Sequence, residues 1–211
     1  VVHGKTFERP PDDSDWVYPE LTIGYDVIDW IEKTLVQPDG LNAGTPVVLT
    51  PEQGRFILWL YAIDRNGRFL YQNLTMIRIK GASKSGMAAM LSMAEFIGPC
   101  RPQFNDDGSL YLGADGQPVA VPHPKPWIQV AAVNISQTQN TFAYFSGLLS
   151  EPVREQYGVS LGRETAFSET GGKVQAVTSS PRSLEGARPS FVVLEETGLW
   201  VPVTTTGPEM M

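Results

Sequence analysis

Lys84 and Ser85 form an adjacent pair of residue types that suits phosphate binding. They follow an apolar run over residues 74–79 and precede a pattern with helical spacing. A strand, a loop and a helix in this order can bind an anion, because the N–H groups and the dipole at the helix start point at it. In such a loop the lysine contacts the β- and γ-phosphates and the next hydroxyl ligates Mg²⁺. We therefore expect these two roles for Lys84 and Ser85.

The loop departs from the usual phosphate-binding pattern GxxxxGK[ST] at both glycines. Arg78 stands at the first glycine position and Ser83 at the second. Lys-Ser pairs also occur in solvated turns, so the loop alone is compatible with a plain polar connection. If position 83 requires a positive φ, a serine there adds strain and weakens phosphate binding. The candidate nucleotide-binding residues of the loop are Arg78, Lys80, Gly81, Ala82, Ser83, Lys84 and Ser85.

A pair of acids, Glu195 and Glu196, ends the apolar stretch "FVVL". A P-loop ATPase needs a carboxylate at the end of a buried strand to hold magnesium through water, and often a second one to polarise the attacking water. We predict that Glu195 and Glu196 together are placed to do both. The alternative is that two acids simply end a strand and solvate its loop.

Gln53 has two interpretations. Its amide is suited to the edge of an adenine if its helix precedes the phosphate loop. It also stands three residues after Thr50, and this spacing is the signature of a capping box at a helix start. The sequence leaves both roles open.

The elements that must position these residues follow from hydrophobic periodicity and turn signals. One helix is expected in "GYDVIDWIEKTLV", with Val27, Ile28, Ile31 and Leu35 on one face, and a second begins after Thr50, with Pro51 in its first turn and a stripe of Phe56, Ile57, Leu60 and Tyr61. The remaining expectations are a strand over 74–79, a helix over 85–97, a surface hairpin over 101–126, a buried strand in "WIQVAAVN", a helix capped by Ser136, an exposed polar stretch over 150–173, and strands in "KVQAVTSS" and "PSFVVLEE".

Strands that alternate with helices predict an α/β fold with a mainly parallel sheet. We expect residues 1–45 to form an N-terminal arm and helix, and residues 46–211 to form the domain that carries the site. The hairpin over 101–126 is expected as a surface insertion in that domain.

Composition limits the function. The chain has 16 Lys and Arg against 23 Asp and Glu, a net charge of −7, which argues against strong nucleic-acid binding by one chain alone. Its single cysteine, Cys100, excludes an internal disulfide framework. No apolar run reaches the roughly 18 residues of a membrane span, and the N-terminus lacks signal-peptide features. We expect a soluble, cytoplasmic protein that is not secreted and has no membrane partner.

Taken together, these motifs resemble the ATPase domain of the large terminase subunit of tailed bacteriophages. The segments "IGYDVIDWIEKTLVQPDG" and "VVLTPEQGRFILWLYAID" resemble the family's leading helix and adenine motif. The segment "RIKGASKSGMAAMLSMAEFIGPC" resembles the family's variant phosphate loop. The segment "VAAVNISQTQNTFAYF" resembles the family's segment after the next core strand, and "LEGARPSFVVLEETGLW" resembles its acidic Walker B strand.

The resemblance implies a three-layer P-loop NTPase domain of the additional-strand, RecA-like type, truncated after the Walker B strand. It implies ATP and Mg²⁺ as cofactors, with Lys84 on the phosphates, Ser85 and Glu195 on the metal, Glu196 on the water and Gln53 on adenine. Glu195 replaces the family's more usual aspartate and is one methylene longer.

The implied partners are double-stranded DNA, the portal protein, the small terminase subunit and further copies of the chain in a ring. Such a motor works in the host cytoplasm during phage assembly. The family's nuclease domain follows the ATPase domain, so we expect no nuclease activity from these residues. Two alternatives stay open: a degenerate P-loop domain with a structural or interaction role, and a helicase-like ATPase of the same fold.

Overall fold

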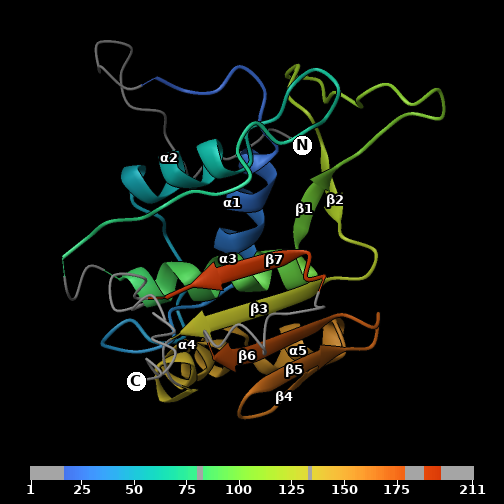
Figure 1. Cartoon of the computed structure of the whole chain (residues 1–211). Coiled ribbons are helices and arrows are strands. Elements are labelled where there is room, and N and C mark those ends of the chain that lie inside the picture. Colours follow the sequence, from blue (N-terminus) through green and yellow to red (C-terminus); the bar gives the residue numbers. More distant parts are fainter. Residues whose placement is uncertain (1–16, 80–82, 133–134, 179–187, 196–211) are drawn as a thin grey trace, which may run out of the picture.

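The computed structural model describes residues 17–79, 83–132, 135–178 and 188–195 (Figure 1). Lys80, Gly81, Ala82 and Glu196, four of the predicted site residues, lie outside these ranges. The helices are α1 (Gly24–Thr34), α2 (Pro51–Leu60), α3 (Lys84–Ile97), α4 (Ile135–Leu148) and α5 (Glu151–Gln156). The strands are β1 (Pro99–Pro102), β2 (Ala120–Pro122), β3 (Trp127–Ala132), β4 (Val159–Leu161), β5 (Thr165–Ser168), β6 (Lys173–Thr178) and β7 (Phe191–Leu194).

The first two helices form as their sequence patterns predict. All four residues of the expected apolar face of α1 are buried. Thr50 and Gln53 make a complete capping box at the start of α2, where Pro51 occupies the first turn. The buried stripe of α2 differs slightly from the prediction, because Leu58 is fully buried while Phe56 and Leu60 are only partly covered.

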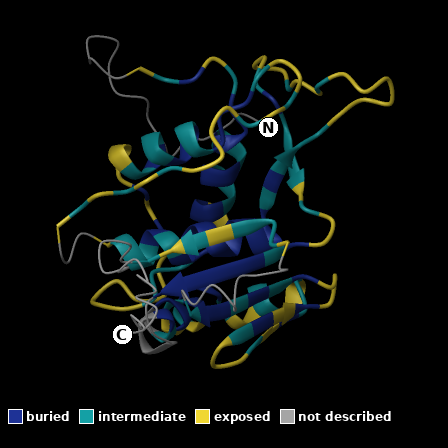
Figure 2. Ribbon diagram, in the orientation of Figure 1, coloured by how far each residue is buried: buried dark blue, intermediate teal, exposed yellow. Residues whose placement is uncertain are grey.

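Helix α3 lies at the centre of the molecule. Its side chains Met87, Met90, Leu91, Ala94 and Ile97 are buried, and they join the side chains of α1 and α2 in one continuous core. Figure 2 shows the buried residues concentrated along α1 and β3. Because this packing holds α3 from Met87 to Ile97 against the sheet, it places the helix start one turn before Met87 at a defined edge of the sheet.

The main sheet has the order β4-β5-β6-β3-β7 and is mixed. β3 pairs in parallel with β6 and with β7, whereas β5 pairs antiparallel with β4 and with β6. The sheet is therefore less parallel than expected. Helices α3 and α4 contact each other and the same strands, and they lie on one side of the sheet in Figure 1. A helical layer on the other side stays a prediction.

Strand β7 is at the edge of the described sheet. Its side chains Val192 and Leu194 are 39% and 50% exposed, although the strand consists only of apolar residues. Apolar runs of this kind are typical of strands that are covered on both sides.

The predicted strand over residues 74–79 is wrong, since the structure assigns no strand there. The segment keeps the period of two that suggested a strand: residues 74, 76 and 78 are partly covered, and residues 75, 77 and 79 are exposed. Ile77 and Ile79 are 90% and 83% exposed. The alternating pattern indicates an extended segment with one covered face. It does not indicate the hydrogen-bonded neighbour that a strand also needs.

Three further predictions concern the hairpin over 101–126, the stretch over 150–173 and the start of α4. β1 pairs antiparallel with β2 and forms the expected hairpin, with further bridges along its length. The stretch over 150–173 is not simply exposed, because it contains α5, β4 and β5 and buries Val159 and Ala166. Helix α4 begins at Ile135, one residue before the predicted cap Ser136.

A buried polar cluster joins the end of α3 to its surroundings. The Glu95 carboxylate accepts a hydrogen bond of 2.9 Å from the Tyr61 hydroxyl and pairs with the Arg101 guanidinium at 3.0 Å. Arg101 also donates to the carbonyl of Ser190, immediately before β7, at 3.2 Å. Burial raises the pKa of the Glu95 carboxyl, although Arg101 and the Tyr61 hydroxyl both favour its charged form. The cluster links α2, α3, β1 and the start of β7.

Candidate functional site

The candidate site lies at the edge of the sheet where the parallel strands β3, β6 and β7 end. In Figure 1 the arrowheads of these strands point toward the same side as the N-terminus of α3. Lys84 is the first residue of α3, and Glu195 directly follows β7. The fold thus brings a cationic residue at a helix start and a carboxylate at a strand end to one edge, although about 110 residues separate them in the sequence.

The Lys84 ammonium is held by the segment that precedes its own helix. Its Nζ donates to the carbonyl oxygens of Arg78 and Ile79, both at 3.0 Å. A phosphate group that binds Lys84 must compete with these carbonyls. The lysine therefore has the position that anion binding needs at a helix N-terminus, but its donors are partly used within the chain.

Ser83, the residue before α3, has φ 55° and ψ 31° in the left-handed region. Among the described residues it is the only non-glycine residue with positive φ. This is the position where GxxxxGK[ST] places its second glycine, so the backbone takes the conformation that a glycine adopts without strain. The condition set by the sequence, a positive φ at residue 83, is therefore met, and the weaker phosphate binding expected from it stays a prediction.

Glu195 is held from two sides. Its backbone N–H donates to the carbonyl of Ala131 in β3 at 2.8 Å, which extends the β3–β7 pairing by one residue. Its Oε1 accepts a hydrogen bond of 2.5 Å from the hydroxyl of Thr141 in α4, a fully buried residue. Sequence reasoning missed Thr141, because a threonine in an amphipathic helix carries no signal for a partner 54 residues away.

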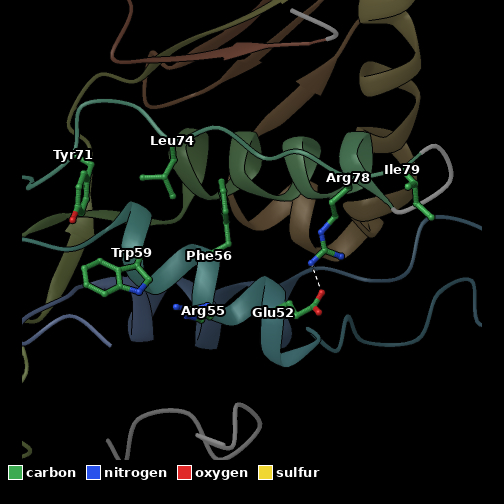
Figure 3. Close-up of a pocket in the computed structure, with 8 residues that line it drawn as sticks. All are labelled: Glu52, Arg55, Phe56, Trp59, Tyr71, Leu74, Arg78 and Ile79. Atoms are coloured by element: carbon green, nitrogen blue, oxygen red, sulfur yellow. Dashed lines mark hydrogen bonds and ion pairs between the residues drawn. The ribbon is translucent and has the colours of Figure 1, made fainter. Parts of the chain in front are cut away.

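Arg78 forms an ion pair with Glu52 in the first turn of α2. The pair closes one end of a groove of about 890 Å³ between α2 and the extended segment (Figure 3). Trp59 and Tyr71 lie at the other end, with their ring centroids 6.0 Å apart. The groove therefore has a charged end at Arg78 and Glu52 and an aromatic end at Trp59 and Tyr71.

Gln53 takes part in the capping box of α2. Its Oε1 accepts from the Thr50 N–H at 2.9 Å, and its own N–H donates to the Thr50 hydroxyl at 3.3 Å. It is not one of the eight residues that line the groove. The capping role is confirmed, and the adenine role stays a prediction.

The donor set suits magnesium. Ser85 and Glu195 offer a hydroxyl and a carboxylate, the oxygen ligands that Mg²⁺ prefers, and Mg²⁺ is usually held by one or two carboxylates together with substrate phosphates. Within the described ranges, no three His, Cys, Asp or Glu residues gather as a metal cluster. A site completed by phosphate oxygens fits these residues better than an all-protein cage.

No family model matches the chain. The chain is 36% identical over 206 residues to the Gene 13 protein of Mycobacterium phage L5, and 35% identical over 208 residues to the Gene 13 protein of Mycobacterium phage D29. Each match covers 89% of this chain and 34% of the relative. The chain thus spans about a third of the length of these curated relatives.

The architecture is also similar to the crystal structure of the HK97 bacteriophage large terminase, with a TM-score of 0.57 over 85% of this chain and 32% of that chain. The chain has a terminase-like fold. At 20% identity the likeness concerns the fold alone. Within the described part of this terminase-like fold, no helix has the length and apolar character to cross a membrane.

Proposed function

We propose that the chain is the ATP-binding and ATP-hydrolysing motor domain of a phage terminase large subunit, which drives double-stranded DNA into the procapsid. The observation that carries the proposal is the position of Lys84 and Glu195 at one edge of the sheet in a terminase-like fold. A phosphate-binding helix start beside a carboxylate at a strand end is the arrangement that P-loop nucleotide hydrolysis requires.

In this proposal each residue has one task. Lys84 leaves the carbonyls of residues 78 and 79 and binds the β- and γ-phosphates. Ser85 and Glu195 hold Mg²⁺, Ser85 directly and Glu195 through water. When bound, Mg²⁺ neutralises charge on the phosphates. Glu196 orients the attacking water, and the N–H groups of the loop over residues 80–83 contact the phosphates.

The partners follow from the same proposal. Portal protein, small terminase subunit and further copies of the chain assemble with it, and the copies form a ring around double-stranded DNA. The net charge of −7 is compatible with this scheme, because several subunits and local contacts share the DNA backbone.

Thermal melting with and without Mg-ATP tests the proposal. A ligand at about 100 times its dissociation constant stabilises the folded state by about 2.7 kcal/mol. For a chain of this size that is a rise of roughly 5–10 °C in the midpoint. The variant Lys84→Ala should lose this rise, whereas Lys125→Ala, which removes an exposed lysine of the β2–β3 connection, should keep it. Equal midpoints for wild type and Lys84→Ala at millimolar Mg-ATP would refute the nucleotide site.

A degenerate P-loop domain with a structural role is the second candidate. Two observations favour it: the left-handed Ser83 and the carbonyl contacts of Lys84, which both raise the cost of phosphate binding. In that case the wild type shows no Mg-ATP shift. A helicase-like ATPase shows the shift and fails to co-purify with a portal protein or a small terminase subunit.

A further inference from the structure

We propose that Thr141 is a positioning residue that fixes the Glu195 carboxylate for the metal. The inference rests on the proposed function and extends it to a residue that neither the motifs nor the comparisons assign. Its basis is the hydrogen bond of 2.5 Å from the Thr141 hydroxyl to Glu195 Oε1, made by a side chain that is fully buried.

Thr141 belongs to the covered face of α4. Thr138, Phe142, Phe145 and Leu148 are buried with it at helical spacing, and α4 contacts β3 and β6. A hydroxyl on a covered helix face usually bonds to a carbonyl of its own helix. The buried Ser92 in α3 does so, with a bond of 2.8 Å to the carbonyl of Ala88, and the exposed Ser146 in α4 likewise bonds to Ala143 at 3.0 Å. Thr141 instead reaches across to the carboxylate.

Glu195 needs such a holder more than an aspartate would. Its side chain has one more rotatable bond, and it stands at the end of an edge strand. Strand β3 fixes its backbone through the bond to Ala131, and this contact leaves the side-chain torsions undetermined. A rigid, buried donor on α4 selects one orientation of the carboxylate before any ligand arrives, so the ordering entropy is lost on folding and not on metal binding.

Two substitutions separate the hydroxyl from the shape of the side chain. Thr141→Val keeps the β-branch and the volume but removes the donor, and Thr141→Ser keeps the donor. Partners that orient metal ligands typically contribute about 10- to 100-fold to metal affinity. Because Glu195 reaches Mg²⁺ through water, we take the lower end of that range and expect Thr141→Val to raise the Mg²⁺ concentration for half-saturation about tenfold, and Thr141→Ser to change it less than about threefold.

The measurement is binding and not turnover. The whole chain is mixed with a fluorescent non-hydrolysable ATP analogue, both at fixed concentration, and Mg²⁺ is titrated into the mixture. Each variant is also melted without ligand. Ser146→Ala is the matched control, since it removes a hydroxyl of α4 that bonds within the helix. It should leave the Mg²⁺ dependence unchanged.

The variant Glu195→Asp provides the second test, and it keeps the question answerable if Thr141→Val folds poorly. A carboxylate one methylene shorter should lose the contact with Thr141, so Glu195→Asp alone should raise the Mg²⁺ requirement by a similar factor. Thr141→Ser and Thr141→Val are also each combined with Glu195→Asp. In this background their Mg²⁺ concentrations for half-saturation should differ less than they do when Glu195 is present.

The outcomes distinguish the two proposals. If the wild type binds the analogue with Mg²⁺ and Thr141→Val needs the same Mg²⁺ concentration, the role of Thr141 is refuted and the nucleotide site stands. If Thr141→Val lowers only the ligand-free melting midpoint, the residue is structural and the inference fails. If the wild type binds no analogue at any Mg²⁺ concentration, the proposed function fails and takes the inference with it.

Discussion

Replacing Ser83 by glycine should stabilise the protein, because Ser83 has the left-handed backbone that glycine adopts freely. An L-residue in this region costs about 1–2 kcal/mol. Glycine also gives the unfolded chain more freedom, which costs about 0.4–1 kcal/mol. The Ser83 side chain makes no capping hydrogen bond, so the substitution removes no hydrogen bond to the first turn of α3. The net expectation for Ser83→Gly is a gain of about 0.5–1 kcal/mol.

A gain of that size raises the melting midpoint of a chain of this length by roughly 1–4 °C, which calorimetry or circular dichroism resolves. Ser150→Gly is the matched control. Ser150 also precedes a helix and also lacks a side-chain capping bond, but its φ of −61° and ψ of 158° are extended. Glycine brings no relief there, so Ser150→Gly should lower the midpoint.

The sign of the change decides the question. If Ser83→Gly lowers the midpoint as Ser150→Gly does, then the backbone at residue 83 is not left-handed, and the strain argument for a weakened phosphate loop is lost. A rise also predicts tighter Mg-ATP binding by the glycine variant if the loop must keep this conformation around phosphate.

Two further predictions concern the buried cluster. Arg101→Met leaves the Glu95 carboxylate, 2% exposed, without its cation. It should lower the free energy of unfolding, measured with urea, by about 3–5 kcal/mol. The double variant Arg101→Met with Glu95→Leu should recover most of this loss. Because burial raises the pKa of Glu95, the carboxyl takes up a proton as the pH falls toward the ordinary range of a glutamate, and the neutral group no longer needs a cation. The loss of unfolding free energy in Arg101→Met should therefore shrink at lower pH. A loss below about 1 kcal/mol at neutral pH would contradict the reasoning. Cys100 is fully buried, and burial raises its pKa to about 12, so roughly one molecule in ten thousand carries the thiolate at about pH 8. A thiol reagent should label Cys100 only as fast as the protein unfolds, and rapid labelling of the native protein would exclude this environment.

Much of the fold could be predicted where local chemistry decides it. The apolar face of α1, the capping box of α2 and the extent of α3 follow from the periodicity and the capping residues. The predicted helix after the phosphate loop and the predicted strand before the acid pair also place Lys84 at a helix start and Glu195 at a strand end, as the structure has them, although the strand expected before the loop is absent. These features depend on residues within one or two turns of each other.

Features that depend on distant partners could not be predicted in this way. Residues 74–79 alternate like a strand, but nothing in their sequence says whether another strand lies beside them. The short strand β5 pairs with β6, and β4 pairs with β5. Because this pairing stabilises them, they can form in a polar stretch that holds only a few apolar residues and gives no clear strand signal. Thr141 reaches Glu195 because α4 packs on the sheet, and no spacing in the sequence encodes that contact.

Within the described sheet, β7 has a paired strand on one side only, so another strand could be added beside Glu195. A strand that hydrogen-bonds in parallel to the other side would run about 4.8 Å from β7 and flank Val192 and Leu194. Its last residues would then stand next to the carboxylate that we assign to magnesium. Addition of one more strand, from whatever source, would thereby insert new side chains directly beside the proposed catalytic centre, so assembly of the sheet and control of hydrolysis would share a single surface.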